Sequence, residues 1–302
     1  MADTRRGIVS GIAAYTMWGL FPLYWPLLKP AGALEILAHR MIWSLVAVLV
    51  ILTVRRNWAW LRTIGLRRML LLAVAALIIT VNWGTYIYAV NSGHTIEAAL
   101  GYFINPLVSV LLGVLVFHER LRSWQWAAIG ISVVAVGVLA ADYGRLPWIA
   151  LLLACSFGTY GLVKKFAATG SAESLTIETA VLFVPALAYT LLAPHQTFTG
   201  HGPGHVALLV GAGVVTAIPL MLFNTAATRV PLTVIGMLQY LAPVIQFLIG
   251  LLVQHEAMPA SRWVGFLLVW AALALLTADG LRAARSRRRA AAPRPEPVAE
   301  AA

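Results

Sequence analysis

The sequence predicts an all-α polytopic membrane protein whose ten transmembrane helices form two inverted five-helix repeats. Three observations predict it: an apolar composition, ten long apolar segments, and an internal sequence repeat whose two copies lie 137 residues apart. The chain is 61% apolar and only 11% charged, whereas soluble domains carry about 25% charged residues. Its mean hydropathy of +0.84 is typical of a protein that spans a bilayer many times.

Ten segments each approach the roughly 20 apolar residues that cross a bilayer core. They lie near residues 7–28, 35–54, 69–91, 95–117, 124–141, 146–164, 174–193, 205–226, 232–254 and 261–281. The last residues, 283–302, are basic and then rich in Pro and Ala, which predicts a disordered tail. We therefore expect a first repeat over 1–142, a second over 143–282, and a cytoplasmic tail over 283–302.

The basic residues predict the orientation. With the N-terminus in the cytoplasm, 18 of the 22 Lys and Arg residues flank cytoplasmic span ends and 3 flank outer ends, while Arg40 falls inside a span. Both termini are therefore expected in the cytoplasm. Because each half holds an odd number of spans, the second copy must be inverted. This topology also explains the +11 net charge, so we expect no nucleic-acid partner.

The two copies of the internal repeat are residues 102–126 and residues 239–263. They are identical at eight of 25 positions, including Pro106/Pro243 and a His-Glu pair. A proline inside a span removes a backbone hydrogen bond and frees a carbonyl group, so both prolines predict kinks that face protein or a cavity. A purely architectural kink is the alternative. Duplicated halves in a membrane protein are typical of a transporter.

Two stripes of small and polar residues follow helical spacing on the fourth and ninth spans. They comprise Glu97, Gly101, Asn105, Ser109 and Gly113, and Gly236, Gln239, Pro243, Gln246 and Gly250. Glycines on such a stripe usually allow close helix packing. Buried amides need partners, so we expect Asn105, Gln239 and Gln246 to line a cavity.

Aromatic residues also gather on the apolar segments. Tyr86 and Trp18 are the better candidates for a cavity that binds an amphipathic organic solute, together with Tyr240. Trp25 and Trp83 lie near expected span ends, where an interfacial aromatic belt explains them well.

Arg40 is the most expensive side chain to bury, because an arginine at a helix centre costs roughly 2.5–3.5 kcal/mol on insertion. Snorkelling to the outer surface is one outcome. The other is a guanidinium that binds a carboxylate solute or pairs with Glu35, Glu97 or Glu178. Glu97 and Glu178 are also the candidates for proton coupling, because burial would raise their pKa; a carboxylate in water at a span end is the alternative.

Several other classes of site lack support. The chain has one cysteine, its loop histidines at 195, 201 and 205 follow no fixed spacing, and neither His-Glu pair extends to a zinc-protease motif. We therefore expect no metal. No Walker motif or clustered catalytic set is evident, so we expect neither an enzyme nor a cofactor other than a coupled proton.

The sequence resembles the RarD-type branch of the EamA family, in the drug/metabolite transporter superfamily, over nearly its whole length except the tail. The resemblance is carried by AAYTMWGLFPLYW from Ala13, EILAHRMIWS from Glu35, NWGTYIYAVNSGHTIEAALGYFINPL from Asn82, FGTYGLVKK from Phe157, IET from Ile177, TAIPLMLFNTAATR from Thr216 and LQYLAP from Leu238. It implies a ten-helix inverted-repeat fold with a central cavity, in a permease of the bacterial inner membrane. Ala242 stands where the first repeat has Asn105, so a symmetrical pair of amide ligands is not expected.

The residues and the resemblance together predict a secondary transporter, and the resemblance alone implies export of a small organic metabolite or drug. The two halves would rock about a site containing Arg40, Tyr86, Asn105, Gln239 and Tyr240. Its expected partners are the solute and the lipid bilayer, and the choice between monomer and homodimer stays open. An accessory membrane subunit, an intramembrane enzyme and a channel are the rival hypotheses.

Overall fold

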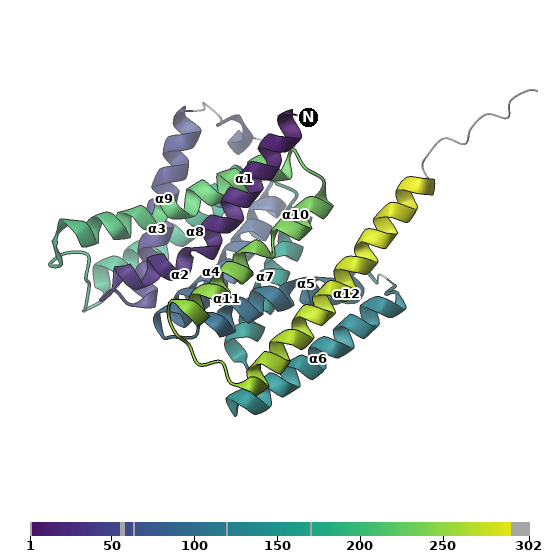
Figure 1. Ribbon diagram of the computed structural model, residues 1–302. Helices are drawn as coiled ribbons and strands as arrows, with labels where there is room; N and C mark the ends of the chain where they lie inside the picture. The colour runs from purple at the N-terminus through teal and green to yellow at the C-terminus, as the bar shows by residue number, and fades with distance from the viewer. Residues whose placement is uncertain (1, 55–57, 63, 119, 170, 291–302) are drawn as a thin grey trace, which may run out of the picture.

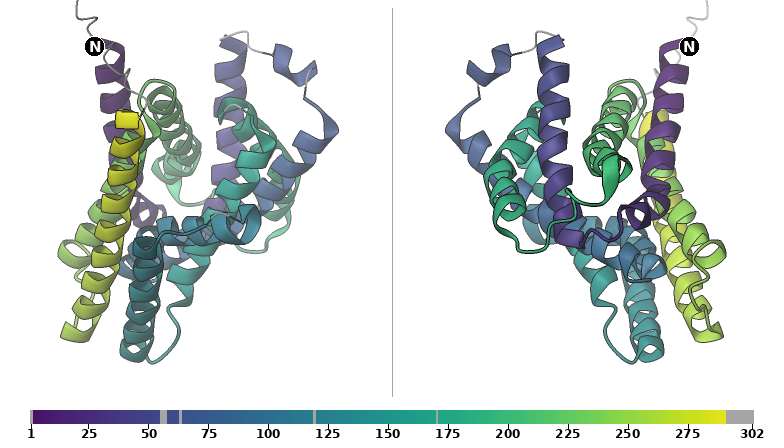
Figure 2. Two further views of the ribbon diagram at one scale, coloured as in Figure 1. Left: turned by 90° about the vertical axis from the view of Figure 1, so that its right-hand side faces the viewer. Right: turned by 90° about the vertical axis from the view of Figure 1, so that its left-hand side faces the viewer.

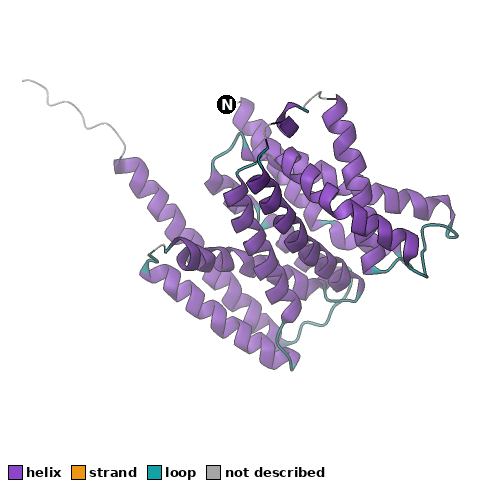
Figure 3. Ribbon diagram, turned by 180° about the vertical axis from the view of Figure 1, so that it is seen from behind, coloured by secondary structure: helices purple, strands orange, loops and turns teal. Residues whose placement is uncertain are grey.

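The computed structural model describes residues 2–54, 58–62, 64–118, 120–169 and 171–290, and across these ranges every regular element is helical (Figure 3). The elements are α1 (Ala2–Gly19), α2 (Phe21–Tyr24), η1 (Trp25–Leu28), α3 (Ala33–Val54), η2 (Ala59–Arg62), α4 (Leu66–Asn91), α5 (Thr95–Phe117), α6 (Ser123–Tyr143), α7 (Trp148–Ala167), α8 (Ser171–Leu192), α9 (Gly202–Ala227), α10 (Leu232–Leu238), α11 (Leu241–Leu252) and α12 (Ala260–Ala290). The chain is thus a polytopic α-helical membrane protein.

Within the described ranges, nine helices are long and apolar enough to cross a membrane, where the sequence predicts ten spans. The difference lies in the first expected span, 7–28, which is divided into α1, α2 and η1. Pro22 and Pro26 stand in the first turns of α2 and η1. Proline has no backbone N–H and favours a helix start, which explains why the chain turns there instead of continuing one helix.

The matched prolines have different effects. Pro243 lies in the first turn of α11, directly after the ninth span breaks between Leu238 and Leu241. Pro106 instead lies inside α5, which runs without interruption from Thr95 to Phe117. The helix is thus interrupted next to Pro243 and continuous through Pro106, where the kink stays a prediction. Nearby turns supply enough hydrogen bonds to carry α5 past one missing N–H.

The tail begins later than expected. Helix α12 continues to Ala290, so residues 283–290 are helical where disorder is predicted. They are mostly Ala and Arg, two of the strongest helix formers, and they extend a helix that is already nucleated. Residues 291–302 lie outside the described part of the chain.

Helix contacts made by one half of the chain are matched by contacts made by the other half. Helix α4 packs on α7 as α9 packs on α1, α5 packs on α7 as α11 packs on α1, and α3 packs on α9 as α8 packs on α4. Three further pairs join helices of equal rank: α3 with α8, α5 with α11, and α6 with α12. The last pair lies side by side at one edge of the bundle (Figure 1). These contacts therefore recur when the helices of one half are exchanged with those of the other.

Small residues let these helices approach closely, as the stripes predict. A Cβ added at Gly101 of α5 would lie 2.7 Å from the Ala150 carbonyl oxygen of α7, and one at Gly250 of α11 would lie 2.8 Å from Ile96 of α5. Gly236 has open space around it instead. Close packing is confirmed for Gly101 and Gly250.

The bundle is not equally tight at its two ends. Helices α1 and α12 on one side and α3 and α4 on the other diverge toward the end that carries the N-terminus (Figure 2). At the opposite end, a buried core includes Phe21, Trp25, Leu37, Tyr86 and Leu209 and joins residues from both halves. This core surrounds the charged residue that the sequence marks as most costly to bury.

Candidate functional site

Arg40 lies inside the protein, on the buried face of α3. Its relative exposure is 2%, so the snorkelling alternative is wrong. Its Nε donates a hydrogen bond of 2.8 Å to the Thr216 hydroxyl of α9, which in turn donates to the Ala212 carbonyl oxygen one turn earlier. The bond connects positions 176 residues apart, in different halves of the chain. The guanidinium is therefore placed where α3 of the first half meets α9 of the second.

Aromatic rings surround the guanidinium. The Arg40 Cζ atom lies 3.8 Å from the ring centroid of Trp83, 5.3 Å from that of Trp25 and 5.7 Å from that of Phe21. Rings at these distances attract a cation through their negative faces, each by about 0.5–2 kcal/mol. Trp25 is fully buried, so it belongs to this site and the interfacial interpretation is wrong for it. Trp83, partly exposed, covers the guanidinium as well.

Within the described part of the chain, Arg40 has no carboxylate partner, because Glu35, Glu97 and Glu178 each contact other groups. Its Nη1 is buried without a hydrogen-bond partner, and so are the Tyr86 hydroxyl and the Trp25 Nε1. Unsatisfied buried polar groups are rare in native proteins because each carries a desolvation penalty of about 1–3 kcal/mol. A cluster of three around one guanidinium indicates a place for a missing acceptor.

A polar network on α4, α5 and α7 supports this site. The Tyr86 and Tyr102 rings meet edge to face with centroids 5.7 Å apart. The Tyr102 hydroxyl donates to Asn82 Oδ1 at 3.2 Å, and Asn82 Nδ2 donates to the Leu153 carbonyl oxygen and to the Ser156 hydroxyl of α7. Tyr86 is thus held in place while its own hydroxyl stays unpaired.

Trp18 and Gln246 form a second group. Gln246 Nε2 of α11 donates to the Trp18 carbonyl oxygen of α1 at 3.2 Å, while its Oε1 is buried without a partner. Because α1 ends at Gly19, the Trp18 carbonyl group lies at a helix end, and a side chain from α11 satisfies it. The Trp18 ring packs on Phe223 of α9 with centroids 5.7 Å apart. These contacts join α1, α9 and α11.

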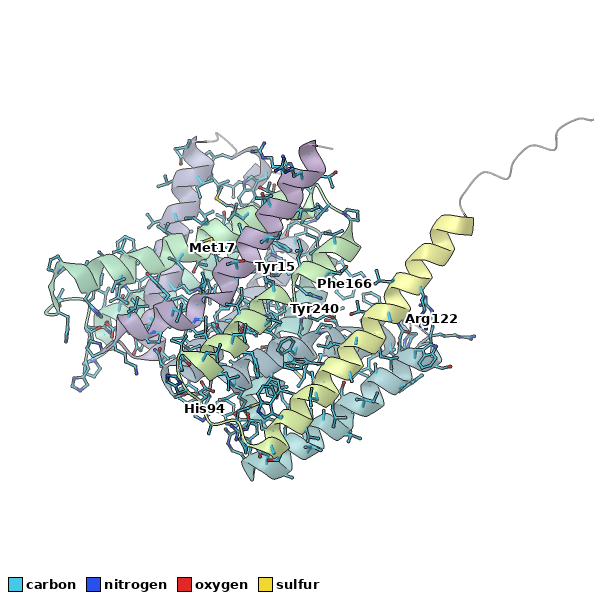
Figure 4. All side chains as sticks on the ribbon, viewed as in Figure 1. Tyr15, Met17, His94, Arg122, Phe166 and Tyr240 are labelled. Carbon is cyan, nitrogen blue, oxygen red and sulfur yellow. The ribbon has the colours of Figure 1, made fainter. Side chains whose placement is uncertain are left out.

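The other predicted binding residues lie apart from Arg40. Asn105 Oδ1 is buried, unpaired and close to Gly158 of α7. Gln239 is half-buried at the break between α10 and α11. Tyr240 lines a pocket of about 440 Å³ with residues of α12, among them Trp270 and Thr277, and Figure 4 shows it at the same break. The predicted set therefore divides into several places.

The Glu97 carboxylate of α5 pairs with groups at the start of α7. Its carboxylate binds the Arg145 guanidinium at 2.8 and 3.3 Å and accepts the Ile149 backbone N–H at 3.2 Å. The side-chain hydrogen bond between Glu97 and Arg145 holds the pKa of Arg145 above its usual value, because it favours the charged guanidinium. Glu97 thereby connects α5 of the first half to α7 of the second.

Glu178 of α8 lies in a buried cluster with residues of α7. Its carboxylate pairs with the Lys164 ammonium at 2.8 Å and accepts hydrogen bonds from the Ser174 hydroxyl at 2.7 Å and the Tyr160 hydroxyl at 3.1 Å. Proton coupling by Glu97 or Glu178 stays a prediction.

Two more carboxylates, the buried Glu35 and the partly buried Glu256, form contacts at the end opposite the N-terminus. Glu35 of α3 accepts the Thr197 and Phe198 backbone N–H groups of the α8–α9 loop at 2.6 and 3.2 Å. Glu256, in the loop after α11, accepts the N–H groups of Thr95 and Ile96 at the start of α5, at 2.5 and 2.9 Å. Each contact connects one half of the chain to the other.

A repeat signal that sequence inspection missed relates Arg40 to Glu178. At a spacing of 138 residues, Glu35 and Leu37 align with Glu173 and Leu175, and Arg40 then aligns with Glu178. The two charges lie on the counterpart helices α3 and α8. Arg40 contacts α2 and η1, while Glu178 contacts α7, so each charge meets the first span of its own half.

Thr216, Trp25, Trp83 and Phe21 were not predicted as site residues. All four stand in the segments that carry the family resemblance, but nothing along the chain pairs any of them with Arg40. Their role follows from helix crossing, which places α2, η1, α4 and α9 around one side chain of α3.

Comparison with known proteins gives consistent results. The model of the EamA-like transporter family matches residues 5–141 and again residues 146–278. Protein RarD of Streptomyces exfoliatus is 58% identical, with 96% of this chain and 95% of that protein covered. The uncharacterized transporter YojE of Bacillus subtilis is 46% identical, covering 91% and 95%. The chloramphenicol-sensitive protein RarD of Pseudomonas aeruginosa is 30% identical, covering 96% and 99%.

One solved crystal structure shares the fold. It superposes with a TM-score of 0.60 at 20% sequence identity, and the match covers 91% of this chain and 98% of that chain.

Proposed function

Because the chain belongs to the EamA-like transporter family, we propose that it is a secondary active transporter that exports a small organic metabolite or drug across the bacterial cytoplasmic membrane by alternating access. One observation carries the proposal: a buried guanidinium with an unpaired nitrogen lies where helices of the two halves meet. A charged residue inside a membrane protein usually marks a solute or ion pathway.

Two features support a ten-span inverted repeat, with α1, α2 and η1 together as the first span. Helix contacts recur when the halves are exchanged. The aligned His118 and His255 both adopt a left-handed backbone conformation with φ of 52°, at the end of α5 and just beyond α11. Non-glycine residues rarely adopt this conformation, so its recurrence at aligned positions favours a common origin of the halves.

The arrangement also supports alternating access. With both termini in the cytoplasm, as the basic loops predict, the divergent end of the bundle faces inward. The end fastened by Glu35, Glu97 and Glu256 then faces outward. Export would require these contacts to break while the inner end closes.

A reversible crosslink tests this mechanism. Cys155 is replaced by Ser, and cysteines are placed at Glu35 and Thr197, whose side chains are in contact. Proteoliposomes loaded with a bacterial metabolite extract are then assayed by mass spectrometry for solutes that leave faster than from protein-free vesicles. Oxidation, or a short bifunctional thiol reagent, should stop efflux, and cleavage of the crosslink should restore it.

The matched control carries only one of the two cysteines, so the same oxidation should leave its efflux intact. Counterflow and saturation should accompany efflux, since a carrier shows both and a channel shows neither. Efflux that continues through the crosslinked protein would contradict alternating access at this end. No protein-dependent efflux of any solute would contradict the transport function itself.

A further inference from the structure

We infer that the bound solute is an organic monocarboxylate, and that Arg40, Tyr86 and Trp25 form the site that holds its carboxylate group. The inference rests on the proposed function in one respect only, that the bound molecule is the one transported. It adds the chemical class of the solute and the three donors that recognise it.

The first argument is charge balance. Arg40 is 2% exposed and, among the described residues, has no ion-pair partner, whereas the buried Glu97 and Glu178 each have one. Aromatic faces and the Thr216 hydroxyl stabilise a guanidinium in part, but they do not neutralise it. An isolated buried charge is strongly disfavoured. A single negative charge on the solute would complete the site.

The second argument is hydrogen-bond balance. Arg40 Nη1, the Tyr86 hydroxyl and the Trp25 Nε1 are all buried, all able to donate, and all without an acceptor. The indole and guanidinium nitrogens can only donate. A carboxylate only accepts, and its two oxygens offer about four lone-pair positions. Its chemistry therefore matches the donors, whereas an ammonium group would add donors to a site that already has too many.

The third argument is the shape of the surroundings. Trp83 lies over the guanidinium at 3.8 Å from its ring centroid. Because a guanidinium donates hydrogen bonds in its own plane, a ring over its face leaves the edge with Nη1 for a carboxylate. Phe21 and Trp25 supply apolar surface beside it. Because the site offers one positive charge and apolar surface, it favours an organic monoanion over a dianionic phosphate.

Two pockets of the protein lie away from Arg40, one lined by Tyr240 and α12 and the other by Lys29, Pro30 and Tyr88. Arg40 is covered by its aromatic neighbours instead. Binding therefore requires these rings to move apart, so the carboxylate site is occluded in this conformation.

The test measures binding to the purified full-length chain by thermal unfolding and calorimetry. The probes are 3-phenylpropanoate, indole-3-acetate and octanoate, each beside its neutral amide, with phenethylammonium and methyl phosphate as further comparisons. At least one acid should raise the unfolding temperature, by mass action on the folded state, while its amide does not. Arg40→Met should weaken that acid roughly thirtyfold or more.

Two milder variants keep the test decisive if Arg40→Met fails to fold. Tyr86→Phe and Trp25→Phe each remove one unpaired donor and keep an aromatic ring. Unliganded Tyr86→Phe should be as stable as the wild type or more so, because only an unpaired hydroxyl is lost. Trp25→Phe should be somewhat less stable, because it also removes buried ring volume. The affinity of each variant for the acid should fall roughly tenfold. Tyr88→Phe, an exposed position on the same helix, is the matched control and should leave affinity unchanged.

Acids that bind no better than their amides would overturn the inference, as would stronger binding of methyl phosphate or phenethylammonium. Equal affinity in the wild type and in Tyr86→Phe and Trp25→Phe would overturn the assignment of these donors. Efflux of a neutral or cationic solute from proteoliposomes would refute the carboxylate site while leaving the transport function intact.

Discussion

Gly213→Ala should separate α3 from α9 and disturb the Arg40 site without changing any residue in it. A Cβ added at Gly213 would lie 2.2 Å from the Trp43 carbonyl carbon and 2.5 Å from the Trp43 Cβ and carbonyl oxygen. These are mainly backbone atoms, so no side-chain rotation relieves the clash. Ordinary contact begins at 3.4 Å, and the helices must therefore move apart by 1.2 Å, the difference between the two distances.

That displacement reaches Thr216, one helical turn from Gly213. Lengthening the 2.8 Å bond from Arg40 Nε by the same amount would give about 4.0 Å, which is no longer a hydrogen bond. Overpacking costs about 1–3 kcal/mol and the loss of a hydrogen bond to a charged group about 1.5–3 kcal/mol. Since alanine gains up to about 1 kcal/mol of helix propensity, the net loss should be about 2–5 kcal/mol.

The assay compares thermal and denaturant unfolding of the detergent-purified wild type, Gly213→Ala and Gly137→Ala. Gly137 lies in the middle of α6 with open space around its Cβ position, so alanine there should leave stability unchanged or raise it slightly. Equal stability of the two variants would refute the close crossing of α3 and α9. Gly213→Ala should also reduce acid binding at the Arg40 site.

The ion pairs give two further predictions. Glu97→Gln should destabilise the protein by about 1 kcal/mol, because it leaves Arg145, which is 38% exposed, to be solvated by water. Arg145→Gln should destabilise it more, because it leaves the buried Glu97 carboxylate without its partner; equal unfolding midpoints of the two variants would contradict this difference in burial. Lys164→Met or Glu178→Gln alone should each cost about 3 kcal/mol, because each leaves a largely buried charge without its partner. The double variant should lose much less than the sum, and additive losses in a double-mutant cycle would show that the two charges are not coupled.

Most helices could be predicted from the sequence because a span is a local property. The fourth expected span, 95–117, coincides with α5, and the second, 35–54, differs from α3 by two residues at one end. The first span was predicted as a single helix and is interrupted, whereas the break in the ninth span lies beside Pro243, where a kink was predicted. A hydropathy pattern averages over about 20 residues, so a short break inside an apolar run leaves its total almost unchanged.

A site residue could be predicted from the sequence only where its own side chain and the segment around it indicated a site. Arg40 is a charge in an apolar segment, which is visible without any knowledge of its neighbours. The interfacial interpretation of Trp25 failed because the chain shortens its first span with α2 and η1, which places that ring in the core. Tyr240 was predicted to share a solute site with Arg40, and the structure places it in the lining of a pocket with α12.

The sequence alone thus determined the membrane class, the approximate spans and the one residue that cannot be buried without compensation. Only the tertiary structure decided what compensates it: Thr216 lies 176 residues from Arg40, and Glu97 and Glu178 are engaged by Arg145 and Lys164. The physical reason is that hydrophobicity acts along each segment, whereas hydrogen bonds and ion pairs depend on atoms within about 3 Å. Helix crossing brings those atoms together across the two halves of the chain.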